Sequence, residues 1–285
     1  MKTVFSVWKI KMDLREYTPT TDQINRLKRT MIDPIVTYQP LILSDNCCTG
    51  TADDWINKSG VYLMEKDNVR PEEWDRFAGA NAKMIRMYND WIDSICNLAG
   101  SLSDLTVVDT AANQGYFLYE FLKRGAKRAV AYDNNHPLLH KSYKLLNEIT
   151  GYNVEFISEP YDMMTHKIPD AIEGDIVLSS AIMVHLSDPT YYLKFLGSIT
   201  KKLLFLFTAI DDNPGYCITY TGEPRTFYKH FDFPICFDAG TSVSQPLIEL
   251  GLRELGFKKV IELSHQKDWL PISWYKPYKA FIAIR

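Results

Sequence analysis

The amino-acid sequence predicts an α/β protein built on a doubly wound, mostly parallel sheet with a reversed last strand and an N-terminal helical appendage. From about residue 105 onward, short apolar runs of strand type alternate with segments of helix type. Near-continuous apolar strands separated by helices are typical of a parallel sheet covered on both faces. The last strand-like run, residues 278–285, follows the preceding one without a helix between them, so we expect this pair to be antiparallel.

Length and composition exclude several classes of protein. The chain has 285 residues, of which 46% are hydrophobic and 24% charged, and a formal net charge of -3, which argues against a protein that mainly neutralises phosphates. No run of about 18 apolar residues predicts a membrane-spanning helix, and the charged N-terminus does not resemble a secretory signal. Five cysteines at irregular positions match neither a disulfide framework nor a metal site. We therefore expect a reduced, cytoplasmic protein without a metal.

The individual elements follow from apolar periodicity and helix-stop signals. Phe117, Leu118 and Phe121 share one helical face, and Gly125 follows two basic residues as a helix stop. Strands are expected at residues 105–110, 128–133, 153–158, 174–180, 201–210, 258–265 and 278–285, and helices between them at 115–126, 136–150, 188–200 and 244–257.

Two further segments lie outside this alternation. Residues 1–100 are expected to form a largely helical cap over the active site, with one clear helix at residues 70–100. Residues 101–285 are expected to form the ligand-binding domain. Within it, residues 211–246 are rich in aromatic side chains and too long for a plain connector, so they are interpreted as an insertion on the substrate side.

The loop after the first expected strand reads "DTAANQG", residues 109–115. In an open parallel sheet, ligands bind beyond the carboxyl ends of the strands, where the strand order reverses. A dinucleotide site needs two or three glycines there, so that the pyrophosphate can rest on the helix N-terminus. Only Gly115 is present, which disfavours a nicotinamide oxidoreductase and favours a ligand without phosphates.

These features together resemble the class I S-adenosylmethionine-dependent methyltransferases, which have a Rossmann-like fold. Asp109 ends the first strand, Gly115 is the only glycine kept from the usual Asp-x-Gly-x-Gly-x-Gly loop, and Asp133 ends the second strand. The stretch "NQGYF" (113–117) is similar to a variant found in the superfamily. The branch that looks most similar is that of the tRNA wobble-uridine carboxymethyltransferases, over residues 85–285, including "DIVLSSAIMVHLSDP" and "LRELGFKKVIEL".

The resemblance implies S-adenosyl-L-methionine as the cofactor and a role for each matching residue. Asp133 is expected to accept hydrogen bonds from the ribose hydroxyls, and Asp162 to bind the adenine amino group, with Glu159 as a competitor for that role. The cofactor-binding residues implied are Asp109, Ala111, Asn113, Gly115, Asp133, Asn134, Asp162 and Ser180. A structural alternative remains open, since Asp109 and Asp133 could cap helices or turns and Asn113 could simply favour a tight turn.

Candidate residues for the acceptor side lie near the carboxyl edge of the sheet and in the insertion. His185 follows the fourth strand, where a general base would help if the acceptor is a hydroxyl; it could instead pack against the cofactor or satisfy a helix end. The expected catalytic residues are His185 and Tyr116, and the expected substrate contacts are Tyr88, Asp211, Tyr216 and His230. Asp211 also suits a plain turn.

The leading functional hypothesis is methyl transfer to oxygen or nitrogen of a small or medium-sized metabolite. One alternative keeps the cofactor but attacks another arm of the sulfonium, in carboxymethyl or aminocarboxypropyl transfer or in cyclisation; aminocarboxypropyl transfer releases methylthioadenosine. Another is a catalytically silent nucleoside-binding module. The net charge argues against nucleic acid, but the basic cluster "RLKRT" (26–30) leaves tRNA open.

Overall fold

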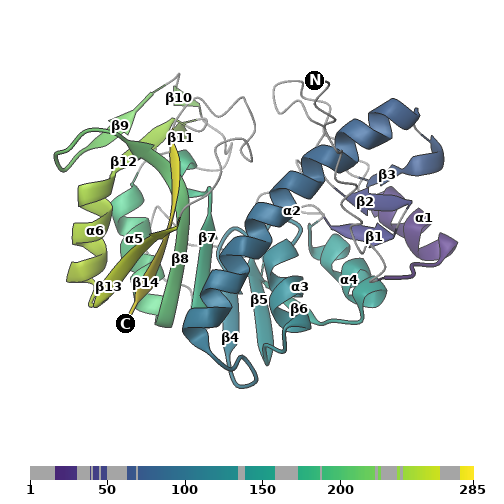
Figure 1. The fold of residues 1–285 in the computed structure, drawn as a ribbon, viewed down its shortest axis with the longest axis horizontal. Helices are drawn as coiled ribbons and strands as arrows, with labels where there is room; N and C mark the ends of the chain where they lie inside the picture. The colour runs from purple at the N-terminus through teal and green to yellow at the C-terminus, as the bar shows by residue number, and fades with distance from the viewer. Residues whose placement is uncertain are drawn as a thin grey trace, which may run out of the picture.

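The central feature of the protein, seen in a computed structural model, is one twisted sheet with helices on both faces (Figure 1). The structure describes residues 17–30, 39, 41–44, 46–49, 63–68, 70–133, 139–157, 173–186, 188–221, 224–225, 236–237, 240–263 and 277–285. The main strands are β4 (Thr106–Asp109), β5 (Arg128–Tyr132), β6 (Val154–Ile157), β7 (Gly174–Ser180), β8 (Thr200–Asp211), β13 (Lys259–Leu263) and β14 (Tyr278–Ile284). Their order across the sheet is β13-β14-β8-β7-β4-β5-β6.

The pairing of the strands confirms the predicted fold class. Strands β4, β5, β6, β7 and β8 are all parallel. Strand β14 is antiparallel to both β8 and β13, so the last strand of the chain is reversed, as predicted. It lies between β8 and β13 rather than at the edge of the sheet, because β13 occupies that edge.

Helices on each face of the sheet enclose a separate apolar core. The helices are α2 (Pro71–Ala99), α3 (Tyr116–Lys123), α4 (Leu139–Thr150), α5 (Pro189–Ile199) and α6 (Gln245–Glu254). Side chains of α2, α3 and α4 form one core cluster with the sheet, and those of α5 and α6 form the other. This two-faced burial explains why the strands are apolar along almost their whole length.

Helix α2 runs diagonally across one face of the sheet (Figure 1) and is held there by aromatic side chains. Trp91 is 1% exposed, and its ring centroid lies 4.7 Å from that of Phe207 and 5.3 Å from that of Phe205, both on β8. Tyr88, one turn earlier, lies 4.8 Å from Phe117 of α3. Large tilted rings at these separations gain both buried area and favourable aromatic contacts.

The N-terminal part contains more than the expected helices. It comprises α1 (Thr21–Thr30), β1 (Ile42–Ser44), β2 (Cys47–Thr49), β3 (Leu63–Glu65), the 3-10 helix η1 (Lys66–Asn68) and α2. The strands form an antiparallel sheet in the order β1-β2-β3, which the sequence did not predict. Arg26 of α1 binds the Glu148 carboxylate of α4 through two hydrogen bonds, of 2.8 and 3.2 Å. The domain boundaries at residues 100 and 101 remain a prediction.

The expected insertion at residues 211–246 adds strands at the carboxyl end of β8. They are β9 (Ile218–Tyr220), β10 (Pro224–Arg225), β11 (Cys236–Phe237) and β12 (Thr241–Ser244). Strand β12 continues the sheet by pairing parallel to the end of β8 and antiparallel to β9. Among the helices described, none is both long enough and apolar enough to cross a membrane.

Replacing Trp91 by alanine is expected to detach α2 from the sheet. Loss of a fully buried tryptophan costs about 3–5 kcal/mol, through lost transfer energy and the cavity left behind. Leu98→Ala on the same helix is the matched control: its side chain is 43% exposed, and it should change the free energy of unfolding by less than roughly 0.5 kcal/mol. Chemical denaturation followed by circular dichroism measures both; equal effects of the two variants would contradict this account of α2.

Candidate functional site

The candidate site lies where the chain reverses its direction of winding across the sheet. Strand β4 has β5 on one side and β7 on the other. The chain passes from β4 through α3 to β5, and later returns from β6 to β7 on the opposite side of β4. The helices that follow β4 and β7 therefore cover opposite faces. In open α/β sheets, the crevice beyond the strand ends at such a reversal is where ligands bind.

The loop after β4 is tied to the end of β5 by backbone and side-chain hydrogen bonds. The backbone amide of Asn113 donates to Oδ2 of Asp133 at 2.8 Å, and the backbone amide of Ala112 donates to the Tyr132 carbonyl at 3.1 Å. Asn113 adopts a left-handed conformation, with φ of 45°. The structure thus brings together Asn113 and Asp133, two of the predicted cofactor-binding residues.

Gly115 is required where the loop enters α3. Its φ is 80°, and a Cβ at this position would lie 2.7 Å from the hydroxyl oxygen of Tyr143. Tyr143 is 1% exposed, stacks on Phe156 at 4.9 Å and donates a hydrogen bond to the Ala112 carbonyl at 3.4 Å. Glycine is therefore kept here by backbone conformation and by the approach of a buried ring.

Asp109 is completely buried at the end of β4. Its Oδ1 accepts a hydrogen bond from the Ala111 amide at 3.2 Å, and its Oδ2 accepts one from Nε2 of Gln39 at 3.3 Å. Burial raises the pKa of Asp109 to about 7; the nearby Asp133 raises it further, while the two hydrogen bonds act in the opposite direction. The carboxyl is thus poised to respond to an added positive charge.

The β7 side of the crevice contains the second sharp backbone feature. Ser180 ends β7 and is half-buried, and Ala181 follows with φ of 58°. Within the described residues, Asn113 and Ala181 are the two non-glycine positions with positive φ, and they follow the neighbouring strands β4 and β7. Left-handed backbone at non-glycine residues is concentrated at ligand-binding and catalytic sites. His185, partly exposed, ends the 3-10 helix η2 (Met183–His185) after this turn.

Tyr88 and Tyr116 lie between α2 and α3 rather than at an open surface. They are 4% and 5% exposed, and their ring centroids are 5.7 Å apart. The Tyr116 hydroxyl donates to Oδ1 of Asn89 on α2 at 3.1 Å. Burial is the main cause that raises the pKa of Tyr88 well above its usual value, and the nearby Asp109 charge adds to this effect. Their roles toward substrate stay predictions.

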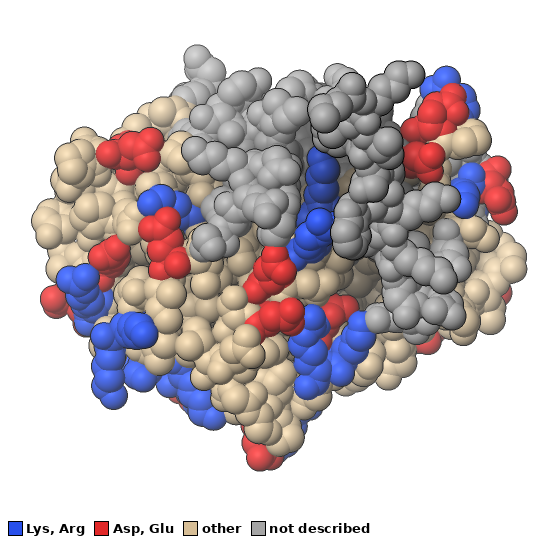
Figure 2. Space-filling model, in the orientation of Figure 1, with Lys and Arg blue, Asp and Glu red and all other residues tan. Residues whose placement is uncertain are grey.

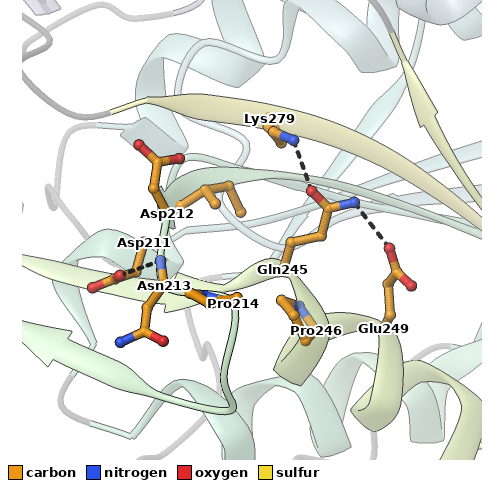
Figure 3. A pocket seen from close by; sticks show the side chains of 9 residues that line it. Asp211, Asp212, Asn213, Pro214, Gln245, Pro246, Glu249 and Lys279 are labelled. Carbon is orange, nitrogen blue, oxygen red and sulfur yellow. Dashed lines mark hydrogen bonds between the residues drawn. The ribbon is translucent and has the colours of Figure 1, made fainter.

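Asp211 lines a separate groove at the end of β8 (Figure 3). Strand β7 lies between β8 and β4 in the sheet. The groove has a volume of about 330 Å³. Oδ1 of Asp211 accepts from the Asn213 amide at 2.8 Å, and Thr219 donates to Oδ2, so this carboxylate closes the turn into β9. Lys279 in the same groove donates to Oε1 of Gln245 at 2.7 Å. Tyr216 is 69% exposed.

Three predicted site residues, Asn134, Asp162 and His230, lie outside the described residues, as does the competitor Glu159. Their roles remain predictions. Within the parts of the chain that are described, no three histidine, cysteine, aspartate or glutamate side chains gather as metal ligands.

Two glutamines that no sequence pattern singled out are buried, one beside the loop and one within it. Gln39 contacts Asp109 although 70 residues separate them in the chain. Gln114 is completely buried, and neither its Nε2 nor its Oε1 has a hydrogen-bond partner among the described residues. An unsatisfied buried amide costs about 1–3 kcal/mol, so it points to a ligand or water that completes the site. These groups suit the ammonium and carboxylate of an amino acid, and they fit the methionine part of S-adenosylmethionine.

The chain shows sequence similarity to enzymes that modify RNA. The tRNA U34 carboxymethyltransferase of Helicobacter pylori (strain Shi470) is 28% identical over 166 residues, which are 55% of this chain and 62% of that protein. The ribosomal RNA small subunit methyltransferase A of Ehrlichia canis (strain Jake) is 24% identical over 135 residues, 44% of this chain and 50% of that protein. These matches span less than two thirds of each relative. No profile of a known protein family matches the chain.

The solved structures that are similar to this chain share its fold. The N-terminal domain of EvdMO1, crystallised in the presence of S-adenosylhomocysteine and D-fucose, superposes with a TM-score of 0.56 at 12% identity, covering 95% of this chain and 98% of that one. Magnesium protoporphyrin IX methyltransferase from Synechocystis PCC 6803 with bound S-adenosylhomocysteine has a TM-score of 0.50 at 14% identity, covering 76% and 88%. The predicted resemblance to class I methyltransferases is confirmed in fold and in partial sequence similarity.

Gly115→Ala is expected to destabilise the protein more than the same substitution at a glycine that has a positive φ but no close neighbour. Gly151→Ala is the matched control, because its φ is 73° and a Cβ there meets nothing within 4 Å. Both variants force alanine into the left-handed region, at about 1–2 kcal/mol. Only Gly115→Ala must also displace the buried Tyr143 ring, which adds about 1–3 kcal/mol. Equal losses of unfolding free energy in denaturation experiments would refute the proposed close packing.

The raised pKa of Asp109 makes stability depend on pH in a defined direction. The folded protein holds a proton on this carboxyl between its ordinary pKa of 3.8 and about 7, whereas the unfolded chain loses it near 3.8. The stability that this linkage provides is complete below about pH 4 and is lost as the pH rises through 7.

Asp109→Asn should abolish that decline, so the free energy of unfolding of the wild type should fall relative to that of the variant between about pH 4 and 7. Asp104→Asn, at an exposed acid before β4, is the control and should run parallel to the wild type. Urea denaturation at several pH values provides the comparison; parallel curves for wild type and Asp109→Asn would show that the carboxyl does not titrate in this range.

Proposed function

We propose that this protein is an S-adenosylmethionine-dependent methyltransferase that acts on oxygen or nitrogen of a small or medium-sized acceptor. The observation that carries the proposal is the hydrogen bond between the Asn113 amide and the Asp133 carboxylate, at the carboxyl ends of β4 and β5. This contact holds an acidic side chain next to a tight loop at the position where the fold binds nucleosides. The fold shared with the solved magnesium protoporphyrin IX methyltransferase supports it.

Different residues are proposed to bind different parts of the cofactor. Asp133 accepts hydrogen bonds from the ribose hydroxyls, with Asn134 flanking the sugar. Asp109 and the loop at Ala111, Asn113 and Gly115 bind the amino acid end. Asp162 is proposed for the adenine amino group, and Ser180 for the β7 side of the pocket.

The bound cofactor supplies an electrophilic methyl group on a positively charged sulfur. Because that charge disappears in the reaction, the protein mainly has to hold the acceptor in line with the methyl carbon and exclude water. His185 after β7 is proposed to take the proton of a hydroxyl acceptor. Tyr116 is proposed as a further catalytic residue, and Tyr88, Asp211, Tyr216 and His230 as acceptor contacts.

The second candidate function is transfer of another arm of the sulfonium, to tRNA or to a small molecule. It is favoured by the sequence similarity to tRNA U34 carboxymethyltransferases. A tRNA substrate would call for a continuous basic face, whereas acidic and basic side chains alternate on the face drawn in Figure 2. A carboxymethyl group would come from a cofactor that is carboxylated on its methyl carbon. Mass spectrometry of both the acceptor and the cofactor product separates the chemistries: methyl and carboxymethyl transfer both leave S-adenosylhomocysteine but add different masses to the acceptor, whereas attack on the aminocarboxypropyl arm leaves methylthioadenosine. A salt-dependent gel shift tests for tRNA.

Calorimetry with S-adenosylhomocysteine tests the proposed cofactor site. Asp133→Ala should weaken binding about 10- to 100-fold, because hydrogen bonds to a charged group contribute about 1.5–3 kcal/mol. Asp133→Asn separates this effect from loop damage, since its carbonyl oxygen can still accept from Asn113 while its amide nitrogen cannot accept from a ribose hydroxyl. It should also weaken binding. Asp104→Ala, at an exposed acid before β4, should not. Unchanged affinity in both Asp133 variants would exclude the site.

A further inference from the structure

Gln39 is a buried residue of the N-terminal part that touches the loop of the candidate site at two points. Its side chain donates from Nε2 to Oδ2 of Asp109 at 3.3 Å. Its backbone amide donates to Oδ1 of Asn113 at 3.4 Å. Gln39 is 3% exposed. A residue that precedes the strands of the central sheet in the chain thus contacts both the buried carboxyl at the end of β4 and the left-handed turn that follows it.

The position of Gln39 is fixed by the small antiparallel sheet that begins three residues later. The Leu41 amide donates to the hydroxyl of Thr49 at 2.8 Å, and the Thr49 amide donates to the Leu41 carbonyl at 2.8 Å. Leu41 and Leu43 are 3% and 0% exposed and belong to the same core cluster as α2 and α3. Gln39 therefore directly precedes a segment that is packed into the core, and this packing holds it beside the loop.

The other half of the Gln39 amide is unsatisfied. Its Oε1 is buried and has no hydrogen-bond partner among the described residues. Oε1 and Nε2 are bonded to the same carbon, so the acceptor stays next to the Asp109 carboxyl that Nε2 binds. Leaving an acceptor buried without a donor costs about 1–3 kcal/mol. This acceptor, next to the Asp109 carboxyl, is therefore free to take a hydrogen bond from a donor on a bound ligand.

We propose that Gln39 is a cofactor-binding residue supplied by the N-terminal part, with Oε1 accepting a hydrogen bond from the ammonium group of S-adenosylmethionine. This inference rests on the proposed function. An ammonium carries several donors, which suits two acceptors side by side, the Asp109 carboxylate and the Gln39 carbonyl. Nε2 meanwhile keeps the carboxylate turned toward the same ammonium. The amide is neutral, so it adds an acceptor without a third negative charge beside Asp109 and Asp133.

The test compares two ligands that differ only at the amino acid end, S-adenosylhomocysteine and 5′-methylthioadenosine, by isothermal titration calorimetry on the full chain. Gln39→Leu keeps the approximate size of the side chain and removes both hydrogen-bonding atoms. It should weaken S-adenosylhomocysteine binding about 10- to 100-fold, as expected for hydrogen bonds to charged groups. Binding of methylthioadenosine, which has no ammonium, should change less than about threefold. Gln23→Leu, in helix α1, is the control and should leave both affinities unchanged.

Gln39→Asn withdraws the amide by one methylene without losing its polarity, and gives the same comparison if the leucine variant does not fold. Equal weakening of both ligands would overturn the inference, because it would show that Gln39 only supports the loop. Unchanged affinity for S-adenosylhomocysteine would overturn it as well. If the wild-type protein bound neither ligand, the proposed function itself would fail, and that outcome is distinct from a failure confined to the Gln39 variants.

Discussion

The hydrogen bond from the Asn113 amide to the Asp133 carboxylate joins the two strand ends on which the candidate site is built. A carboxylate that is 8% exposed needs donors, and a left-handed asparagine needs a contact that offsets its backbone strain. The hydrogen bond gives the carboxylate a donor and gives Asn113 a stabilising contact. It can form because β4 and β5 pair in a register that places Asp109 opposite Ala131. The geometry of the loop is thus a consequence of strand pairing in the sheet.

Residues from the first hundred positions contact both the central sheet and the candidate site. Trp91 packs α2 onto β8, and Gln39 reaches the loop after β4, so the same part of the chain covers the sheet and the candidate site. Gln39 contacts the completely buried Asp109 carboxyl, and burial is the main cause of the raised pKa of Asp109. Folding of the N-terminal part and the electrostatics of the crevice are therefore coupled.

The sequence predicted the sheet because its strands are longer and carry a strong pattern. The run at residues 174–180 is β7 to the residue, and the acids at positions 109 and 133 lie at strand ends as expected. Strands β1, β2 and β3 have three residues each, too few to show an alternation, and they were not predicted. Gln39 has no signal at all, since its contact with Asp109 spans 70 positions. Gln114 was within the recognised loop, but nothing in a sequence tells a buried amide from a turn residue.

The distribution of charge in the crevice is consistent with a cationic ligand. Asp109 and Asp133 are close enough to raise the pKa of Asp109, and the polar side chains added around them, Gln39 and Gln114, are neutral amides. A lysine there would neutralise the acids permanently and remove the attraction for an incoming ammonium, whereas amides provide hydrogen bonds and leave the negative potential in place.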